Sequence, residues 1–382
     1  MTRPLVLPAA DEPVVSVVIP AFHVKTFRSC LVSLAEHLPT DLACEVVAVF
    51  NGPSGALHNA AESVDGLRVI ASPHNLGFPA GLNLGRAAAR GRYLLLFQDD
   101  AVAEAGWLEA LVAAAEAHPE AGAVGGMVLS RDGDGVQSSG LVLWNDASQA
   151  VVDENHSVAE AGRRGLHAVD YTSSSSLLVP AAVWDSVGGA CEDFFPAGHV
   201  DADLAMRIRG AGRAVLCEPA ARTRHVQGAS RTAGYKRFTG VRNALLFRER
   251  WGAELARTQE PPGERGRAEV ERALERAGER WRRVRETGPP DVSPSAPAKP
   301  PFAQDAPREE QLEVALRHAE RHLALRLAYE AELEPAFEHF EAEAVALRAE
   351  SQSLRDELAR SQELVESIVS GRWWRLRGRL RR

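Results

Sequence analysis

The chain has 382 residues, 45% of them hydrophobic, which is enough for a sizeable core and a further segment. Its formal net charge of -8 argues against a general nucleic-acid-binding protein. The 4 cysteines are widely spaced, so neither a zinc knuckle nor a disulfide framework is expected. The N-terminus lacks a secretory apolar segment, and no stretch approaches the roughly 20 apolar residues of a membrane-spanning helix. These observations predict a cytoplasmic protein.

From residue 14 to about 250, apolar runs alternate with helical patterns, as in a mostly parallel sheet covered by crossover helices. Strands are predicted at 14–19, 45–50, 67–71, 93–97 and 214–217, with a further apolar run at 123–129. Helices are predicted at 27–37, 79–90 and 107–118. Pro20 is expected to end the first strand, and a turn at Pro219 is expected after the last.

The composition changes after Trp251, where Glu, Arg and Ala dominate. We expect a charged helical segment at 253–288 and a Pro-rich linker at 289–307. Residues 308–369 are expected to be helical, and their apolar positions follow alternating three- and four-residue steps. These positions are Leu347, Leu354, Leu358, Val365 and Ile368. They form either a short coiled coil that allows a homo-oligomer or one face of a solvated helix lying on its own catalytic domain.

Residues 370–382 form a basic tail that contains two tryptophans, two leucines and six arginines. Such a tail can place its rings at the headgroup level of a bilayer while its guanidinium groups meet anionic lipid. Peripheral attachment to the inner face of the cell membrane is therefore a hypothesis. The alternatives are a disordered basic tail and a contact with an acidic partner.

Two acidic motifs carry the candidate chemistry. The first, Gln98-Asp99-Asp100, directly follows the predicted strand at 93–97. Ligands of open α/β sheets bind outside the carboxyl ends of the strands, so a metal and a diphosphate could bind there. The second motif places Asp201 and Asp203 just before a helical pattern that includes Arg207. One of these two acids could act as a catalytic base.

Five short motifs occur in a characteristic order along residues 14 to about 250. They are Ser16-Val17-Val18-Ile19-Pro20-Ala21-Phe22, the stretch from Asn75 to Gly85, Gln98-Asp99-Asp100, Asp193-Phe194-Phe195 with Asp201-Ala202-Asp203-Leu204 and Arg207, and Pro219 to His225. Together they resemble the family 2 glycosyltransferases of the GT-A fold, particularly the bacterial rhamnosyltransferase-like members. The resemblance implies an α/β GT-A domain at 1–252 that binds a nucleotide-sugar donor.

The resemblance also implies roles for the acidic residues. Asp100 is expected to bind Mg²⁺ or Mn²⁺, and His225 is expected to complete the metal or diphosphate site. Asp201 is the expected base that deprotonates the acceptor hydroxyl during inversion. Asp203 is expected to cap the following helix or to hold Arg207, which could help to orient the base. Val200 replaces the acid that is common before the base.

The donor side departs from the family at two positions. Gln98 replaces the first acid of the metal motif, and its amide can still bond a ribose hydroxyl. Asp99 either compensates for the missing charge or caps the turn after its strand. Phe50 replaces the acid that reads the base beside Asn51, so the nucleotide stays open. The remaining residues expected near the nucleotide are Pro20, Ala21, Phe22, Asn51, Asn75, Gly77, Phe78, Gly81 and Asn83.

Two structural alternatives stay open at this stage. Gly81 and Gly85 either let the backbone approach a ligand or permit close packing on the sheet. Aromatic and hydroxyl side chains either line an acceptor site or fill the core. These side chains are Trp144, Ser173 to Ser176, Trp184, Phe194 and Phe195.

The sequence thus predicts an inverting, metal-dependent transferase that moves a sugar to a saccharide or lipid-linked acceptor in cell-surface polysaccharide synthesis. A sugar-1-phosphate nucleotidyltransferase is disfavoured because residues 20–23 contain no glycine-rich loop. The departures at Phe50, Gln98 and Val200 leave a second interpretation, in which a degenerate transferase domain acts as a membrane-associated scaffold.

Overall fold

The computed structural model describes residues 5–52, 54–225, 233–263 and 266–292, and isolated helical positions between 316 and 356. The chain divides into two compact units, Met1–Ala319 and Glu320–Arg382. The apolar positions from Leu347 to Ile368, residues 293–307 of the expected linker and the basic tail lie outside the described residues. The site and the sheet belong to the first unit.

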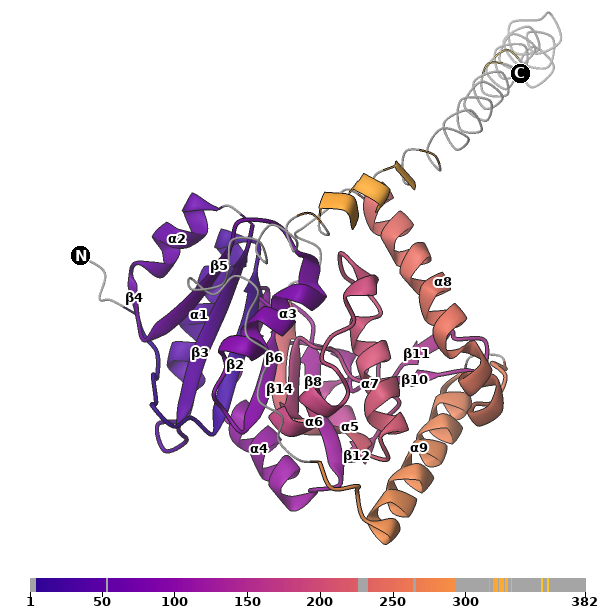
Figure 1. Cartoon of the computed structure of the whole chain (residues 1–382). Helices are drawn as coiled ribbons and strands as arrows, with labels where there is room; N and C mark the ends of the chain where they lie inside the picture. The colour runs from indigo at the N-terminus through magenta and orange to yellow at the C-terminus, as the bar shows by residue number, and fades with distance from the viewer. Residues whose placement is uncertain are drawn as a thin grey trace, which may run out of the picture. The chain divides into compact units, whose positions relative to one another are not determined.

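A mixed sheet of ten strands forms the centre of this unit (Figure 1). Its strand order is β12-β14-β8-β13-β6-β2-β3-β5, with β7 beside β14 and β9 beside β8. The strands are β2 (Val15–Ala21), β3 (Cys44–Asn51), β5 (Leu67–Ser72), β6 (Tyr93–Phe97), β7 (Ala101–Ala103), β8 (Ala121–Leu129), β9 (Val136–Ser138), β12 (His167–Ala168), β13 (Ser176–Pro180) and β14 (Ala214–His225). Two small pairs lie outside this sheet, β1 (Leu5–Val6) with β4 (Val64–Asp65) and β10 (Leu141–Leu143) with β11 (Gln149–Val151).

Helices cover both faces of the sheet. They are α1 (Val24–His37), α2 (Gly55–Ala61), α3 (Gly77–Ala88), α4 (Trp107–Ala117), α5 (Val158–Gly162), α6 (Ala181–Ser186), α7 (Val200–Gly210), α8 (Ala233–Thr258) and α9 (Arg267–Thr287), with a 3-10 turn η1 at Glu192–Phe194. Side chains alternate between the faces of a strand, so neighbours in β2 enter different cores. Val17 and Ile19 belong to the core cluster that includes residues of α1 and α4, whereas Val18 belongs to the cluster that includes residues of α3 and α7.

The predicted strands and helices are present, with ends that differ by a few residues. The first and last strands differ most. β2 continues through Pro20 to Ala21, which pairs with Phe50 of β3. β14 does not turn at Pro219 but continues to His225, with an irregular register between Glu218 and Arg222. A β-bulge accommodates such extra residues and bends the strand, and this places the end of β14 beside β7.

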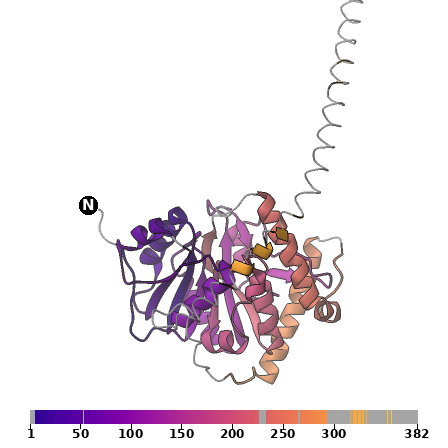
Figure 2. The same cartoon turned by 45° about the horizontal axis from the view of Figure 1, so that its top comes forward.

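The charged segment after Trp251 packs on the sheet unit. The expected boundary at residue 252 falls inside α8. In α9, Ala273, Leu274 and Ala277 are buried. Figure 2 shows the orange α9 on the side of the sheet unit opposite the indigo N-terminal strands. Among the described residues, no helix combines the length and apolarity needed to cross a bilayer.

Candidate active site

The candidate site lies where several strands end at one edge of the sheet. β2, β3 and β6 run parallel, so their carboxyl ends at Ala21, Asn51 and Phe97 lie on the same edge. β13 runs antiparallel to β6 and begins there, because Ser176 pairs with Phe97. The topology therefore brings the residues after β2, β3 and β6 close to the residues before β13.

Asp100 and His225 meet at this edge. β7 pairs antiparallel with the end of β14, and Ala101 lies opposite His225. Asp100, which directly precedes Ala101, therefore lies close to His225. His225 Nε2 lies 3.2 Å from Asp100 Oδ1, and both side chains are 17% exposed. The other ring nitrogen, Nδ1, lies 3.2 Å from Gln137 Oε1. The two expected metal ligands therefore adjoin one another and remain accessible.

Asp201 joins this cluster from the first turn of α7. The backbone N–H of Ser174 donates to Asp201 Oδ2 at 3.2 Å, and Gln98 Nε2 donates to Ser174 Oγ at 3.2 Å. Burial raises the pKa of Asp201, although the hydrogen bonds from Ser174 and the charge of His225 oppose this effect. The structure thus connects the candidate base with both Gln98 and His225.

Asp99 has a local structural role. Its Oδ2 accepts the backbone N–H groups of Phe22 at 2.6 Å and His23 at 2.8 Å. Burial raises the pKa of Asp99, and these two hydrogen bonds oppose it. The side chain therefore caps the turn after β2. One expectation placed this cap at the turn after β6, the strand that Asp99 itself follows, and the structure differs there. It holds Phe22 at the edge, while Pro20 and Ala21 are buried in β2.

Asn51 fixes the loop before α3 rather than pointing at a ligand. Its side-chain oxygen accepts the N–H of Leu76 at 2.6 Å, and its amide nitrogen donates to the carbonyl of Gly77 at 2.6 Å. Asn75 accepts the N–H of Gly77 at 3.0 Å, and its side chain is exposed. Phe78 donates its N–H to Pro196 at 2.7 Å, which joins this loop to the segment before α7.

Position 77 requires a residue without a Cβ for two reasons. Its φ is +81°, and a Cβ there would lie 2.6 Å from the Phe195 ring. The expected glycines further along α3 serve packing. A Cβ on Gly81 would lie 3.1 Å from Pro20, and one on Gly85 would lie 2.1 Å from Val18. Of the two alternatives for Gly81 and Gly85, the structure therefore favours close packing of α3 on β2.

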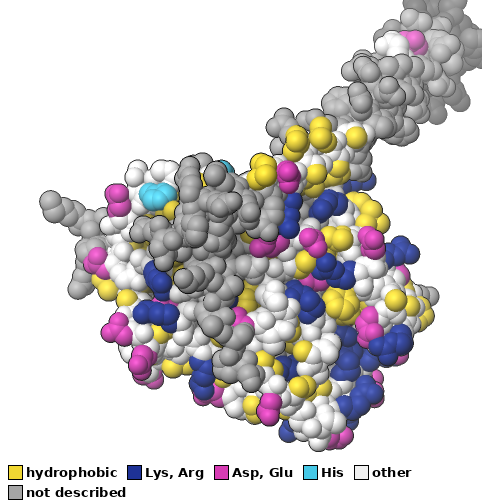
Figure 3. Space-filling view, in the orientation of Figure 1, with side chains coloured by type: hydrophobic (Ala, Val, Ile, Leu, Met, Phe, Trp, Pro, Cys, Tyr) yellow, Lys and Arg dark blue, Asp and Glu magenta, His cyan; other side chains and the backbone are white. Residues whose placement is uncertain are grey.

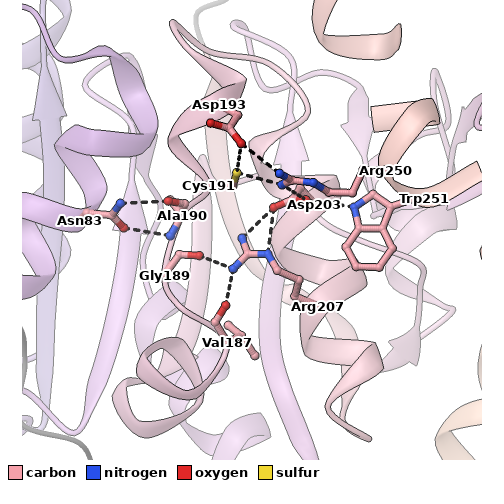
Figure 4. Close-up of polar contacts among 10 residues, drawn as sticks. All are labelled: Asn83, Val187, Gly189, Ala190, Cys191, Asp193, Asp203, Arg207, Arg250 and Trp251. Atoms are coloured by element: carbon pink, nitrogen blue, oxygen red, sulfur yellow. Dashed lines mark hydrogen bonds and ion pairs between the residues drawn. The ribbon is translucent and has the colours of Figure 1, made fainter. Parts of the chain in front are cut away.

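Asn83, expected near the nucleotide, instead ties α3 to the loop before α7 (Figure 4). Its amide donates to the carbonyl of Ala190 at 2.9 Å and to Glu192 at 3.2 Å. The N–H of Ala190 donates back to Asn83 at 2.9 Å. With all these bonds directed at protein atoms, Asn83 acts as a positioning residue.

Asp203 does not cap its helix. It is fully buried and accepts hydrogen bonds from three side chains (Figure 4). Helix α7 begins after His199, which has φ +61° and caps without its side chain. Asp203 Oδ2 accepts from Arg207 at 2.9 Å, while Oδ1 accepts from Arg250 at 3.2 Å and from Trp251 at 3.0 Å. The alternative expectation, that Asp203 holds Arg207, is confirmed.

Arg207 fastens the start of this loop as well. One of its nitrogens donates to the carbonyls of Val187 at 2.5 Å and Gly189 at 2.6 Å. The pair of Asp203 and Arg207 thereby connects α7 with both α8 and the residues that follow α6. Its function is to fix the position of the helix that carries Asp201.

Sequence reasoning missed Arg242 and Asn243 of α8. Arg242 donates to the carbonyls of Asp193 and Phe195, both at 3.2 Å. Asn243 is completely buried, and its amide donates to the carbonyls of Phe194 at 3.0 Å, Ala197 at 2.9 Å and Gly198 at 3.2 Å. The partners lie 45–49 residues away, so no local spacing signals the contact. Helix α8 therefore holds the loop that leads into Asp201.

The acceptor-side candidates divide in a similar way. Trp144, Trp184, Phe194 and Phe195 are at most 3% exposed, so they fill the core. Val200, in the place of the family's first acid, is also a core residue. Ser174, which touches both Gln98 and Asp201, contributes to the site. The Ser175 and Ser176 hydroxyls are buried and have no hydrogen-bond partner among the residues that the structure describes.

The donor atoms at this edge fit a cation that is shared with a substrate. Within the described residues, no three His, Cys, Asp or Glu side chains gather into a complete cation site. Asp100 and His225 supply one carboxylate and one imidazole. Mg²⁺ is commonly held by one or two carboxylates together with substrate phosphates. This donor set therefore suits a cation that the diphosphate of a donor would complete.

Comparison with known proteins agrees with this geometry. The model of the family Glycosyl transferase family 2 matches residues 16–166. The O-antigen biosynthesis protein RfbC of Myxococcus xanthus is 30% identical over 171 residues, which is 42% of this chain and 13% of that protein. The uncharacterized protein y4gI of Sinorhizobium fredii is 26% identical over 238 residues, which is 59% of this chain and 26% of that protein. The chain thus spans only 13% and 26% of the length of these two relatives.

Among solved structures, a mannosyltransferase from Pyrobaculum calidifontis in complex with GDP-Man and Mn²⁺ superposes with a TM-score of 0.47. It is 18% identical, and the match covers 85% of each chain. The matched residues 16–166 contain β2, the loop before α3 and the Gln98-Asp99-Asp100 motif. Over residues 16–166 the chain thus matches glycosyltransferase family 2, and the α/β sheet covered by helices agrees with the fold expected from that resemblance.

Proposed function

We propose that this chain is an inverting, metal-dependent glycosyltransferase. It would move a sugar from a nucleotide-sugar donor to a saccharide or lipid-linked acceptor. The name of the Myxococcus xanthus relative, an O-antigen biosynthesis protein, supports a role in cell-surface polysaccharide synthesis. The proposal rests above all on one observation, which is that Asp100, His225 and Asp201 from three separate segments share one sheet edge.

Asp201 is the proposed base. During inversion, the acceptor oxygen forms a bond to the anomeric carbon while the bond to the diphosphate breaks, and the hydroxyl proton passes to a carboxylate. A base works best when its pKa lies near the operating pH, and burial moves the pKa of Asp201 upward in that direction. The backbone N–H of Ser174 donates to Oδ2 of Asp201, and Ser174 also bonds this carboxylate through its side chain, which orients it.

Asp100 and His225 are the proposed ligands of Mg²⁺ or Mn²⁺. A divalent cation would offset the negative charge that develops on the leaving diphosphate. The imidazole is oriented by Gln137 on its second nitrogen, as is typical of metal-binding histidines. Gln98 lies beside Ser174, where its amide can bond a donor hydroxyl without adding charge.

The donor is expected to contact the backbone around Phe22 and the loop at 75–78, which Asp99 and Asn51 hold in place. Phe50 cannot read the base, because it is fully buried against Phe27 and His58. The base is therefore recognised through other groups than in family members that carry an acid there. Peripheral membrane contact through the basic tail and a homo-oligomer through the helical region remain proposals.

The test is the release of nucleoside diphosphate from a panel of nucleotide sugars, with a membrane extract as the source of acceptors. We expect turnover that needs Mn²⁺ or Mg²⁺, disappears with EDTA and is lost in Asp100→Ala and His225→Ala. Asp132→Ala, which changes an exposed loop carboxylate, is the matched control. If a nucleotide bound but no donor turned over, a scaffold function of this domain would replace the proposal.

A further inference from the structure

A second candidate site lies at the opposite end of β14, between α9 and the sheet edge formed with β12. A pocket of about 220 Å³ opens there. Four arginines line it, which are Arg209, Arg213, Arg280 and Arg283, together with Trp281 and smaller apolar residues. None of the lining residues is acidic. In Figure 3, basic side chains gather over the lower right of the molecule, where Figure 1 places α9.

Next to this pocket, three arginines surround the carboxylate of Asp170, while Glu120 accepts from the pocket residue Trp281 and the charge of Glu254 acts on Arg209. Arg209 lies 3.1 Å from Asp170, Arg276 lies 3.5 Å from it, and Arg280 also pairs with it. Three guanidinium groups therefore share one fully buried carboxylate. Arg276 also reaches the exposed Glu260 at 4.0 Å, whereas Arg209 and Arg280 have Asp170 as their common ion-pair partner.

The same arginines carry hydrogen-bond donors that the protein does not use. Arg209 Nε, Arg213 Nε and Arg280 Nη1 are buried and donate no hydrogen bond within the described part of the chain. Arg213 uses its terminal nitrogens on the carbonyls of Pro119 at 3.1 Å and Pro290 at 2.8 Å, and the charge of Asp291 acts on it from outside the pocket. Buried donors without partners are costly, and all three belong to arginines that line the pocket.

The buried charge of Arg209 also favours an anion. Burial lowers the pKa of Arg209 to about 10, and the charges of Arg280 and Arg276 add to this effect, while the charges of Asp170 and Glu254 oppose it. An additional anion near Arg209 would stabilise its charged form. The site therefore gains from negative charge that no residue of the pocket wall supplies.

We propose that this pocket binds a phosphoryl group. Guanidinium forks match phosphate oxygens in geometry and charge. The volume lies below the roughly 300–1,000 Å³ of sites for drug-sized ligands, so the pocket suits a phosphate or diphosphate group rather than a whole nucleotide sugar. The phosphoryl group belongs either to a free inorganic anion or to a lipid headgroup, since both present the same oxygens.

This site is separate from the proposed catalytic edge. The pocket includes Ala214 and Val215 at the start of β14, whereas His225 ends the same strand. Val215 pairs with Ala123 of β8 and Arg224 pairs with Leu129, so at about 3.3 Å per residue of β8 the two sites lie roughly 20 Å apart along the sheet. A phosphoryl group in the pocket thus cannot belong to the donor that is bound at the catalytic edge. The proposal goes beyond the transferase function and does not depend on it.

The test uses Trp281, which lines the pocket, as a local probe in the full-length chain. The protein is labelled with 5-fluorotryptophan, the Trp281 signal is assigned with Trp281→Phe, and inorganic pyrophosphate is titrated in EDTA while ¹⁹F spectra are recorded. Arg213→Gln and Arg283→Gln remove pocket guanidinium groups without touching Asp170. Arg282→Gln is the matched control, because Arg282 is the exposed neighbour of Arg283 on α9 and lies outside the pocket wall.

We expect a saturable shift of the Trp281 signal, with affinity reduced about 10- to 100-fold in Arg213→Gln and in Arg283→Gln and unchanged in Arg282→Gln. No shift at millimolar pyrophosphate, or an equal response of all variants, would overturn the proposal unless vesicles bind through the pocket. That second arm compares sedimentation with phosphatidylglycerol and phosphatidylcholine vesicles. Loss of phosphatidylglycerol binding in the two pocket variants alone identifies a headgroup as the source, and failure of both arms refutes the site.

Discussion

The buried carboxylate of Asp203 offers the sharpest test of how the helix that carries Asp201 is held. Asp203→Ala removes the acceptor of Arg207, Arg250 and Trp251 at once. Asp203 is 0% exposed, while Arg207 and Arg250 side chains are 19% and 33% exposed. Removing one partner of a buried ion pair costs about 3–5 kcal/mol. The remaining exposure and the carbonyl contacts of Arg207 place the expected loss at the lower end, about 3 kcal/mol.

Urea unfolding followed by circular dichroism measures this loss. The variants are compared only if the dependence of the unfolding free energy on urea concentration, the m-value, stays the same. Asp193→Ala is the matched control, because Asp193 accepts from the same Arg250 at 3.0 Å but is 53% exposed. An exposed pair contributes only about 0–1 kcal/mol. Equal losses for the two variants, or a loss of less than about 1 kcal/mol for Asp203→Ala, would refute this role of Asp203.

Three further predictions concern packing, positioning and protonation. Gly85→Ala should lower the free energy of unfolding by about 1–3 kcal/mol, because the new Cβ would meet Val18. Gly240→Ala is the control, because a Cβ there would have no neighbour within 4 Å and should not destabilise α8. Thermal unfolding of both variants checks this prediction. Asn243→Ala should lower kcat about tenfold with little effect on donor KM, since it loosens the loop before Asp201; an unchanged kcat would contradict this role. The acid limb of kcat/KM should lie above the ordinary aspartate value of about 4, because the base acts when deprotonated and burial raises the pKa of Asp201. Because the pKa of Asp201 is raised in the folded state, its ionised form destabilises the folded state above that pKa. Asp201→Asn should therefore be at least as stable as the native chain at neutral pH. An acid limb at or below about pH 4 would contradict the raised pKa.

The sequence predicts the parts of this molecule that depend on local patterns. The run Tyr93–Phe97 is recognisable as a buried strand, and the carboxylates after it could be placed at the sheet edge from strand topology alone. The end of β14 could not be predicted in this way. A proline usually interrupts a strand, and only the irregular pairing with β8 and the contact with β7 carry the strand on to His225.

Side-chain roles proved harder to predict where the partner is distant in sequence. Asp99 bonds to N–H groups 76 and 77 residues away, and Asn83 bonds to a loop 107 residues away. A motif shows that such residues matter but not whether they touch a ligand or hold a loop. Helices α8 and α9 illustrate the same limit, because their charged composition indicates surface helices while their few buried residues pack against the sheet unit.

The role of Asp201 as the base is the centre of this account. The decisive measurement compares nucleoside diphosphate release and donor binding for the native chain, Asp201→Asn and the exposed control Asp41→Asn. We predict that Asp201→Asn loses acceptor-dependent turnover by at least about 100-fold while it binds the metal-donor complex as tightly as the native chain does, and that Asp41→Asn is unaffected. Turnover in Asp201→Asn within a few-fold of the native chain would contradict the account.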